Sequence, residues 1–161
     1  MRVVSAKTAE LFAAAAESGA VLARGPGGYA AALREYGRNL GVAFQLVDDT
    51  LDYSGRQALM GKSVGDDFRE GKVTLPVILA FARADEPSRK FWKRAVETGP
   101  QSEADLDRAI TLVEETGAIA DTMARARAYA DLACDALRAV PPCEMRDVLA
   151  GVAGFCVERA Y

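Results

Sequence analysis

Apolar residues recur at helical spacing along nearly the whole chain, and no segment alternates between polar and apolar residues as a half-buried strand would. Alanine, leucine, glutamate and arginine, which all favour helices, are abundant. The 161 residues suit one domain, and half of them are hydrophobic, so there is ample material for a core. We therefore predict an all-α fold, with a single helical domain over residues 1–161.

Glycine, proline and polar loop residues separate the expected helices. We expect one loop over Arg24–Gly28 and a longer one over Ser54–Lys72, with at most short helical turns. Ser102, with Asp105 three residues later, resembles a capping box at the start of a helix. The expected helices are Val3–Ser18 stopping at Gly19, Tyr29–Tyr53, Pro76–Arg83, a helix from Asp85 to just before Gly99, one from Ser102 to Gly117, Ala118–Ala139, and Glu144 to the end.

The composition argues against several classes of function. A net charge of −3 with mixed signs gives no argument for binding nucleic acid or an anionic membrane. No run of about 18 apolar residues is present, so no transmembrane helix is expected. Charged residues come too early at the N-terminus for a signal peptide, and we expect a cytoplasmic protein. The absence of histidine removes the commonest general base and histidine metal sites.

The three cysteines, Cys134, Cys143 and Cys156, include no CxxC pair. Their odd number argues against a disulfide framework, and their spacing argues against a zinc site. We interpret them as reduced core residues, because free cysteine is usually buried.

The stretch FQLVDDTLD, from Phe44 to Asp52, places three aspartates inside an expected helix, where aspartate is a poor helix former. A set of polar residues recurs there at i, i+3, i+4 and i+7 and so shares one face: Gln45, Asp48, Asp49 and Asp52. The opposite side carries Leu33, Tyr36, Leu40, Phe44, Val47 and Leu51. We expect one side of this helix to pack and the other to present clustered carboxylates.

Two interpretations of this acidic face are open. A solvated surface usually prefers glutamate and alternates charge signs at i+4, whereas Asp48 and Asp52 repel each other at that spacing. A hard-cation site is the other interpretation, because Mg²⁺ prefers carboxylate oxygens and commonly bridges them to substrate phosphates. On this interpretation, aspartates one turn apart hold Mg²⁺ and leave coordination positions for a diphosphate.

Lysines near the acidic helix offer contacts for phosphate oxygens. Lys7 precedes Thr8 in the first helix, and Lys62 and Lys72 each follow a glycine in the long loop. Each lysine alone is more typical of a solvated surface charge. We interpret the segment DDFRE, residues 66–70, mainly as structural, either capping a helix or pairing with loop lysines.

In combination, FQLVDDTLD, GKSVGDDFREGKVTLP and the preceding KTAELF helix resemble the trans-isoprenyl (polyprenyl) diphosphate synthases. The resemblance covers nearly the whole chain, and the combination is far more specific than a lone DDxxD. It implies an isoprenoid synthase-type helical bundle, Mg²⁺ as cofactor, and elongation of an allylic diphosphate with isopentenyl diphosphate. The departing diphosphate can accept the proton, so the absence of histidine is no obstacle.

The resemblance also implies roles for individual residues. The second aspartate-rich motif falls on Asp48, Asp49 and Asp52, with Asp48 the strongest candidate for direct metal contact. Lysines that contact diphosphate fall on Lys7, Lys62 and Lys72. Residues that line the substrate region fall on Thr8, Phe44 and Gln45, with Phe44 lying toward the packing side. The implied catalytic residues are Lys7, Thr8, Gln45 and Lys62.

The family's first aspartate-rich motif lies well upstream of the KT element, whereas this chain begins only a few residues before Lys7. We therefore expect the C-terminal half of a synthase, with half of the metal cradle and little or no activity alone. Helices that pack on a missing half would expose apolar faces, so we expect self-association or pairing with an N-terminal half.

The alternative is a noncatalytic subunit or regulatory partner of a prenyl diphosphate synthase. A terpene cyclase shares the fold and the metal logic, but its second metal motif usually mixes asparagine, serine or threonine with glutamate. The plain DDxxD of this chain fits that class less well. The length of the prenyl product is left open by the sequence.

Overall fold

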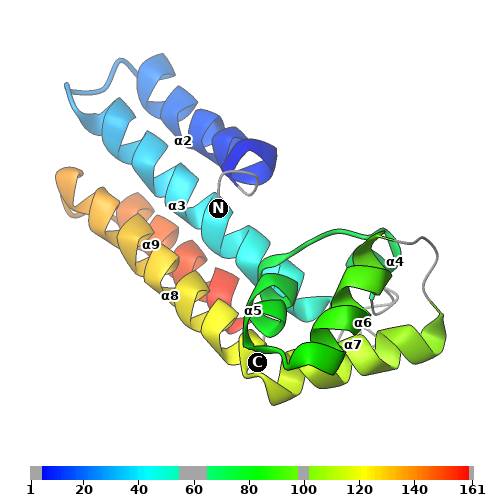
Figure 1. Ribbon diagram of the computed structural model, residues 1–161. Helices are drawn as coiled ribbons and strands as arrows, with labels where there is room; N and C mark the ends of the chain where they lie inside the picture. The colour runs from blue at the N-terminus through cyan, green and yellow to red at the C-terminus, as the bar shows by residue number, and fades with distance from the viewer. Residues whose placement is uncertain (1–4, 55–64, 98–101, 160–161) are drawn as a thin grey trace. The chain divides into compact units, whose positions relative to one another are not determined.

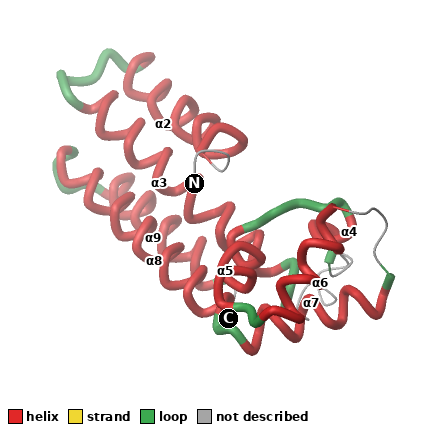
Figure 2. The backbone as a smooth tube through the Cα atoms, viewed as in Figure 1, coloured by secondary structure: helices red, strands yellow, loops and turns green. Residues whose placement is uncertain are grey.

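The computed structural model describes residues 5–54, 65–97 and 102–159. Within these ranges all regular structure is helical and no strand occurs, so the all-α prediction is confirmed (Figure 2). None of the helices in the described ranges has both the length and the apolarity needed to cross a membrane. The chain forms two compact units, described separately below: unit 1 is Met1–Val47 with Ala124–Tyr161, and unit 2 is Asp48–Met123. The single domain over residues 1–161 stays a prediction.

Unit 1 contains the helices from both ends of the chain (Figure 1). A π-helical turn, η1 (Ser5–Ala9), runs directly into α2 (Glu10–Leu22), and α3 (Tyr29–Leu51) follows a loop. After α8 (Ala118–Ala136) the backbone tightens into a 3-10 turn, η3 (Leu137–Ala139), before α9 (Glu144–Glu158). The boundary between the units falls within α3 and within α8.

The close approach of α2 to α3 depends on two glycines of α3. A Cβ atom at Gly37 would overlap the carbonyl oxygen of Phe12, and one at Gly41 would lie 2.7 Å from the Cα of Ala9. Neither position has room for a side chain, so the two backbones meet directly. We call this contact the glycine seam. Ion pairs also join the two helices: Arg34 with Glu10 and Glu17, and Arg38 with Glu10.

The core of unit 1 lies between α3, α8 and α9. The Tyr36 hydroxyl donates a hydrogen bond to the carbonyl oxygen of Leu149 at 2.8 Å, which joins α3 to α9. Small residues dominate on the α8 and α9 side, so the helices approach closely. The buried members of this core are Tyr36, Leu40, Ala43, Ala130, Ala133, Leu137, Ala153 and Cys156.

In its described residues, unit 2 contains the end of α3, the start of α8 and, between them, α4 (Asp66–Arg69), α5 (Leu75–Arg83), α6 (Glu86–Glu97) and α7 (Glu103–Glu115). Trp92 of α6 is fully buried and meets Phe68 and Phe91 edge to face, with ring centroids 6.4 and 5.3 Å apart. These aromatic rings supply much of the apolar area buried in so small a unit. The other buried members are Tyr53, Val77, Ala80, Ala95, Leu106, Ala109, Val113 and Ala118.

The expected helix starts in unit 2 agree with the structure. The Ser102 hydroxyl accepts a hydrogen bond from the backbone N–H of Asp105, and the Asp105 carboxylate accepts one from the backbone N–H of Ser102. The predicted capping box is therefore confirmed. Pro76 lies in the first turn of α5, where its missing N–H costs no helical bond. Gly117, at φ 66°, separates α7 from α8 in a left-handed conformation.

Two expectations are wrong. The first helix does not stop at Gly19: α2 continues to Leu22, and the Gly19 carbonyl accepts a hydrogen bond from the N–H of Ala23 at 3.1 Å. A glycine lowers helix stability by about 1 kcal/mol, which is too little to end a helix that packs along one side. Cys143 is exposed rather than in the core, because it immediately precedes α9, whereas Cys156 is buried and Cys134 is partly buried.

Candidate functional site

Of the three aspartates of the DDTLD stretch, Asp48 and Asp49 lie in the last turn of α3 and Asp52 follows its end; all three belong to unit 2 and differ in exposure. Asp48 is half-buried, whereas Asp49 is 4% exposed and Asp52 is 5% exposed. The helix face that we expected to present all three carboxylates therefore presents only Asp48. Burying a carboxylate is costly unless the protein supplies hydrogen bonds, so the buried aspartates require partners.

The partners of Asp52 are backbone groups of the segment that leads into α4. Its Oδ1 accepts the N–H of Asp66 at 3.1 Å, and its Oδ2 accepts the N–H of Asp67 at 3.0 Å. The carbonyl oxygen of Asp52 accepts the N–H of Gly65 at 2.9 Å. Burial, and then the negative charge of Asp67, raise the pKa of Asp52 to about 6, against the two backbone N–H groups, which lower it.

The DDFRE segment makes the ion pairs that its sequence suggested. Lys72 Nζ contacts Asp67 at 2.8 Å and Glu70 at 2.6 Å, and these two hydrogen bonds raise the pKa of Lys72. Arg69 reaches Glu103 of α7 at 3.0 Å. Lys72, matched above to a diphosphate-contacting lysine, is thus exposed and held among carboxylates of its own segment.

In unit 1 the structure brings together two of the expected substrate-region residues. The Thr8 hydroxyl donates a hydrogen bond to Gln45 Oε1 at 2.7 Å, which joins η1 to α3. The residues are 37 positions apart in sequence, so only the packing of η1 and α2 on α3 makes the contact. Lys7 is exposed on η1, beside Thr8. π-Helical turns occur frequently at functional sites.

Phe44 lies between an aromatic ring and a cation. Its ring centroid is 5.4 Å from that of Phe12, and the Arg159 guanidinium lies 4.2 Å from it on a cation–π contact. Arg159 also donates to the Phe44 carbonyl oxygen at 3.2 Å. This packing agrees with the expectation that Phe44 lies toward the packing side of its helix. Sequence reasoning missed Arg159; its only signal was a basic residue at the end of the last helix, where cations are favoured.

Lys62, expected to contact diphosphate, lies outside the described residues. Among the described residues, no three carboxylate or thiol side chains are grouped so that they could hold a metal ion. The donor chemistry of Asp48 and Asp49 nevertheless fits a hard divalent cation, because their ligand atoms are carboxylate oxygens. Asp48 is the more accessible of the two.

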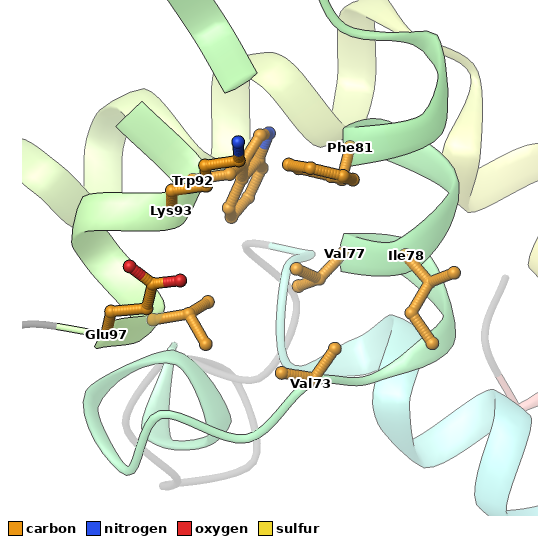
Figure 3. A pocket seen from close by; sticks show the side chains of 8 residues that line it. Val73, Val77, Ile78, Phe81, Trp92, Lys93 and Glu97 are labelled. Atoms are coloured by element: carbon orange, nitrogen blue, oxygen red, sulfur yellow. The ribbon is translucent and has the colours of Figure 1, made fainter. Parts of the chain in front are cut away.

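A cavity of about 220 Å³ lies between α5 and α6 in unit 2 (Figure 3). Its walls are mostly apolar, with Trp92 and Phe81 lying near each other, and Lys93 and Glu97 are the charged residues of its lining (Figure 3). The remaining lining residues are Val73, Val77, Ile78 and Val96. None of the candidate residues that the structure describes lines this cavity.

The comparisons with known proteins agree on one family. The family described as polyprenyl synthetase matches residues 1–113 of the chain. Octaprenyl diphosphate synthase of Haemophilus influenzae is 40% identical over 161 residues, and the match covers 100% of this chain and 49% of that protein. Decaprenyl-diphosphate synthase subunit 1 of Schizosaccharomyces pombe is 34% identical over 153 residues, covering 95% of this chain and 39% of that protein.

Solved structures show the same likeness. A polyprenyl synthase from Caulobacter crescentus, complexed with calcium and isoprenyl diphosphate, is 49% identical, with a TM-score of 0.93 over 99% of this chain and 48% of that one. A decaprenyl diphosphate synthase from Rhodobacter capsulatus is 46% identical, with a TM-score of 0.91 over 99% of this chain and 49% of that one. The chain thus spans about half the length of the relatives it matches.

Proposed function

The chain belongs to the polyprenyl synthetase family, and on this premise we propose that it is part of a prenyltransferase that elongates an allylic diphosphate with isopentenyl diphosphate. The observation that carries the proposal is the pair Asp48–Asp49 at the end of α3, in a family where one solved member is complexed with calcium and isoprenyl diphosphate. Carboxylate oxygens at this position suit a divalent cation that also binds diphosphate.

We propose Mg²⁺ as the cation, with Asp48 as its main ligand and Asp49 as a second ligand. Both Ca²⁺ and Mg²⁺ prefer oxygen ligands, and Mg²⁺ is the one commonly bound through one or two carboxylates plus substrate phosphates. When bound, Mg²⁺ stabilises the negative charge on the departing diphosphate. Asp52 belongs to the same motif, but both of its side-chain oxygens accept backbone N–H groups, which favours a positioning role over metal contact.

The remaining candidate residues hold the substrates. Lys7, Lys62 and Lys72 donate charge-assisted hydrogen bonds to phosphate oxygens. The Thr8–Gln45 pair fixes a hydroxyl and an amide together in the substrate region, and Phe44 supports it by packing on Phe12 and Arg159. Location in the cytoplasm stays a prediction.

We propose that the chain as given has little or no activity alone and pairs with an N-terminal half, because it spans about half of its relatives. The alternative is a noncatalytic subunit or regulatory partner of a prenyl diphosphate synthase; one relative is named as a subunit, decaprenyl-diphosphate synthase subunit 1. A noncatalytic subunit does not need Asp48 for turnover. The activity of the Asp48→Asn variant therefore distinguishes the two candidate functions.

The test measures incorporation of labelled isopentenyl diphosphate into a prenyl product. The native chain alone should give no turnover, and the chain mixed with the N-terminal half of the H. influenzae relative should restore it. The variant Asp48→Asn should then lower turnover by at least about tenfold through loss of a metal ligand. Asp107→Asn, an exposed aspartate of α7, is the control and should leave it unchanged.

Equal turnover with the native chain and with Asp48→Asn would favour the noncatalytic subunit. Steady turnover by the native chain alone would contradict the proposed dependence on a second half.

A further inference from the structure

Asp52 makes three hydrogen bonds to three consecutive residues of one segment. The side-chain oxygens accept the N–H groups of Asp66 and Asp67, and the main-chain oxygen accepts that of Gly65. With 5% of its surface exposed, Asp52 is buried within this contact. The contact joins the residue that follows α3 to the start of α4, so Asp52 fixes where α4 begins.

A carboxylate is needed for this contact because two N–H donors are presented side by side. The first N–H groups of any helix lack an intrahelical acceptor, and the residue before α4 is Gly65, which has no side chain to cap them. Asp52 supplies both acceptors from a distant position in sequence, in charge-assisted hydrogen bonds. Asparagine offers one acceptor oxygen and alanine none, which gives a graded set of variants.

The backbone at Gly65, which donates to the Asp52 carbonyl oxygen, also has little freedom. Gly65 has a φ of 84°, and a Cβ atom built there would overlap Leu106 of α7. The turn into α4 is therefore seated directly on α7. Arg69 adds a salt bridge to Glu103 of α7 at 3.0 Å.

Asp67, which Asp52 holds in place, in turn contacts Lys72. The Asp67 carboxylate contacts Lys72 Nζ at 2.8 Å, and the Asp67 carbonyl oxygen accepts the backbone N–H of Lys72 at 2.8 Å. Asp67 thus holds Lys72 at its main chain and, together with Glu70 at 2.6 Å, at its side chain, and Asp67 is itself held by Asp52.

We infer that Asp52 is a positioning residue, which acts through Asp67 to place Lys72, while metal contact falls to Asp48 and Asp49. The link from Asp52 to Lys72 stands on the contacts alone, whereas the role of Lys72 toward diphosphate rests on the proposed function. A third aspartate that accepts backbone bonds with both oxygens has less freedom to turn toward an ion than the half-buried Asp48.

The first experiment measures amide hydrogen exchange at Asp66 and Asp67 by NMR, together with the acetylation rate of Lys72 relative to exposed Lys90. In Asp52→Ala, both amides should exchange at least about tenfold faster because their acceptors are lost, and Lys72 should be acetylated several-fold faster because Asp67 is no longer held in place beside it. Asp52→Asn should lie between Asp52→Ala and the native chain. Ser102→Ala removes a different helix cap in unit 2 and controls for general destabilisation: it should leave the Lys72 rate unchanged.

The second experiment measures the affinity of the same variants for inorganic pyrophosphate with Mg²⁺. Asp52→Ala and Lys72→Ala should each weaken binding, and the double variant should bind no more weakly than either, because both act through one group. Mn²⁺ added in place of Mg²⁺ should broaden the NMR signals of Asp48 and Asp49 equally in the native chain and in Asp52→Asn.

The inference is overturned if Asp52→Ala leaves amide exchange and Lys72 acetylation at native values. It is also overturned if Asp52→Asn abolishes the Mn²⁺ broadening while the amides stay protected, since Asp52 would then act as a ligand. Absence of any pyrophosphate or Mn²⁺ binding by the native chain would count against the proposed function, and amide exchange would still decide the role of Asp52.

Discussion

Aspartates of unit 2 that look alike in sequence have different physical roles. Asp52 is buried and accepts backbone bonds, Asp48 is half-buried at the end of α3, and Asp105 caps α7 while pairing with Arg94 of α6. The pKa of Asp52 is raised and that of Asp105 is lowered, to about 6 and about 2. The difference arises because burial opposes the charge of Asp52, whereas Arg94 favours the charge of Asp105.

The lowered pKa of Asp105 predicts a pH-dependent contribution to stability. The hydrogen bond from Arg94 and then that from the N–H of Ser102 lower its pKa from 3.8 to about 2. The folded state therefore releases this proton more readily than the unfolded state, so the stabilisation is complete above about pH 4 and disappears toward pH 2. Asp105→Asn should melt below the native chain at neutral pH, and the gap in Tm should close as the pH falls through that window.

Circular dichroism melting curves, recorded from neutral pH to the lowest pH with a cooperative transition, provide the measurement. Asp107→Asn lies on the same helix, is exposed, and should follow the native curve at every pH. A difference in Tm between Asp105→Asn and the native chain that stays constant with pH would contradict the conclusion that ionised Asp105 stabilises the fold.

At the scale of the helices, the pairing of α2 with α3 depends on small residues. Gly37 and Gly41 leave no space for a side chain, and the Arg34 and Arg38 ion pairs with α2 are partly exposed. Exposed ion pairs contribute about 0–1 kcal/mol each, so we expect the glycine seam to dominate the pairing.

Gly37→Ala should therefore destabilise unit 1 by about 1–3 kcal/mol, because the added methyl group meets backbone atoms that cannot move aside cheaply. Gly19→Ala is the matched control, since Gly19 lies in α2 with nothing near its missing Cβ. That change should raise stability by up to about 1 kcal/mol through the higher helix propensity of alanine. Urea unfolding provides the measurement, and equal effects of the two changes would rule out the seam as the reason.

Local signals in the sequence predict the helices well. The capping box of Ser102, Pro76 at the start of α5 and Gly117 before α8 each act within one helical turn, so the sequence alone locates them. The predicted end of the first helix at Gly19 differs from the observed end at Leu22, because packing along one side carries the helix past the glycine. A glycine's effect depends on its neighbours in space, which periodicity does not reveal.

The candidate site was predicted in part. Motif likeness brought Thr8 and Gln45 into one group, and they are hydrogen bonded. The backbone acceptor role of Asp52 was not predicted, because its donors lie 14 and 15 residues away in sequence. Arg159 was missed for the same reason: its contact with Phe44 joins residues 115 apart.

The whole chain exposes an apolar face on α9. Met145 and Phe155 are 66% and 68% exposed, and Val148 and Val152 lie on the same side at helical spacing. We call these four residues the α9 face. Exposed apolar surface of this kind favours association, in line with the proposed pairing or self-association.

Polar substitution of the α9 face should weaken self-association. In the double variant Met145→Ser and Phe155→Ser, the concentration for half-association should rise by at least about tenfold, since each buried side chain contributes about 1.5–3 kcal/mol. Light scattering after size-exclusion chromatography, over a range of concentrations, provides the measurement. Glu158→Ser, an exposed polar position of α9, is the control. A native chain that stays monomeric throughout would contradict the prediction.

The glycine seam also sets the register of α2 along α3. Only hydrogen atoms fit at Gly37 and Gly41, so sliding α2 by one residue would press its backbone against Cβ atoms one position away. Such a slip amounts to about 1.5 Å along the axis, enough to separate the Thr8 hydroxyl from its 2.7 Å contact with Gln45. Gly37 and Gly41, which carry no side-chain carbon, therefore determine where Thr8 lies relative to Gln45.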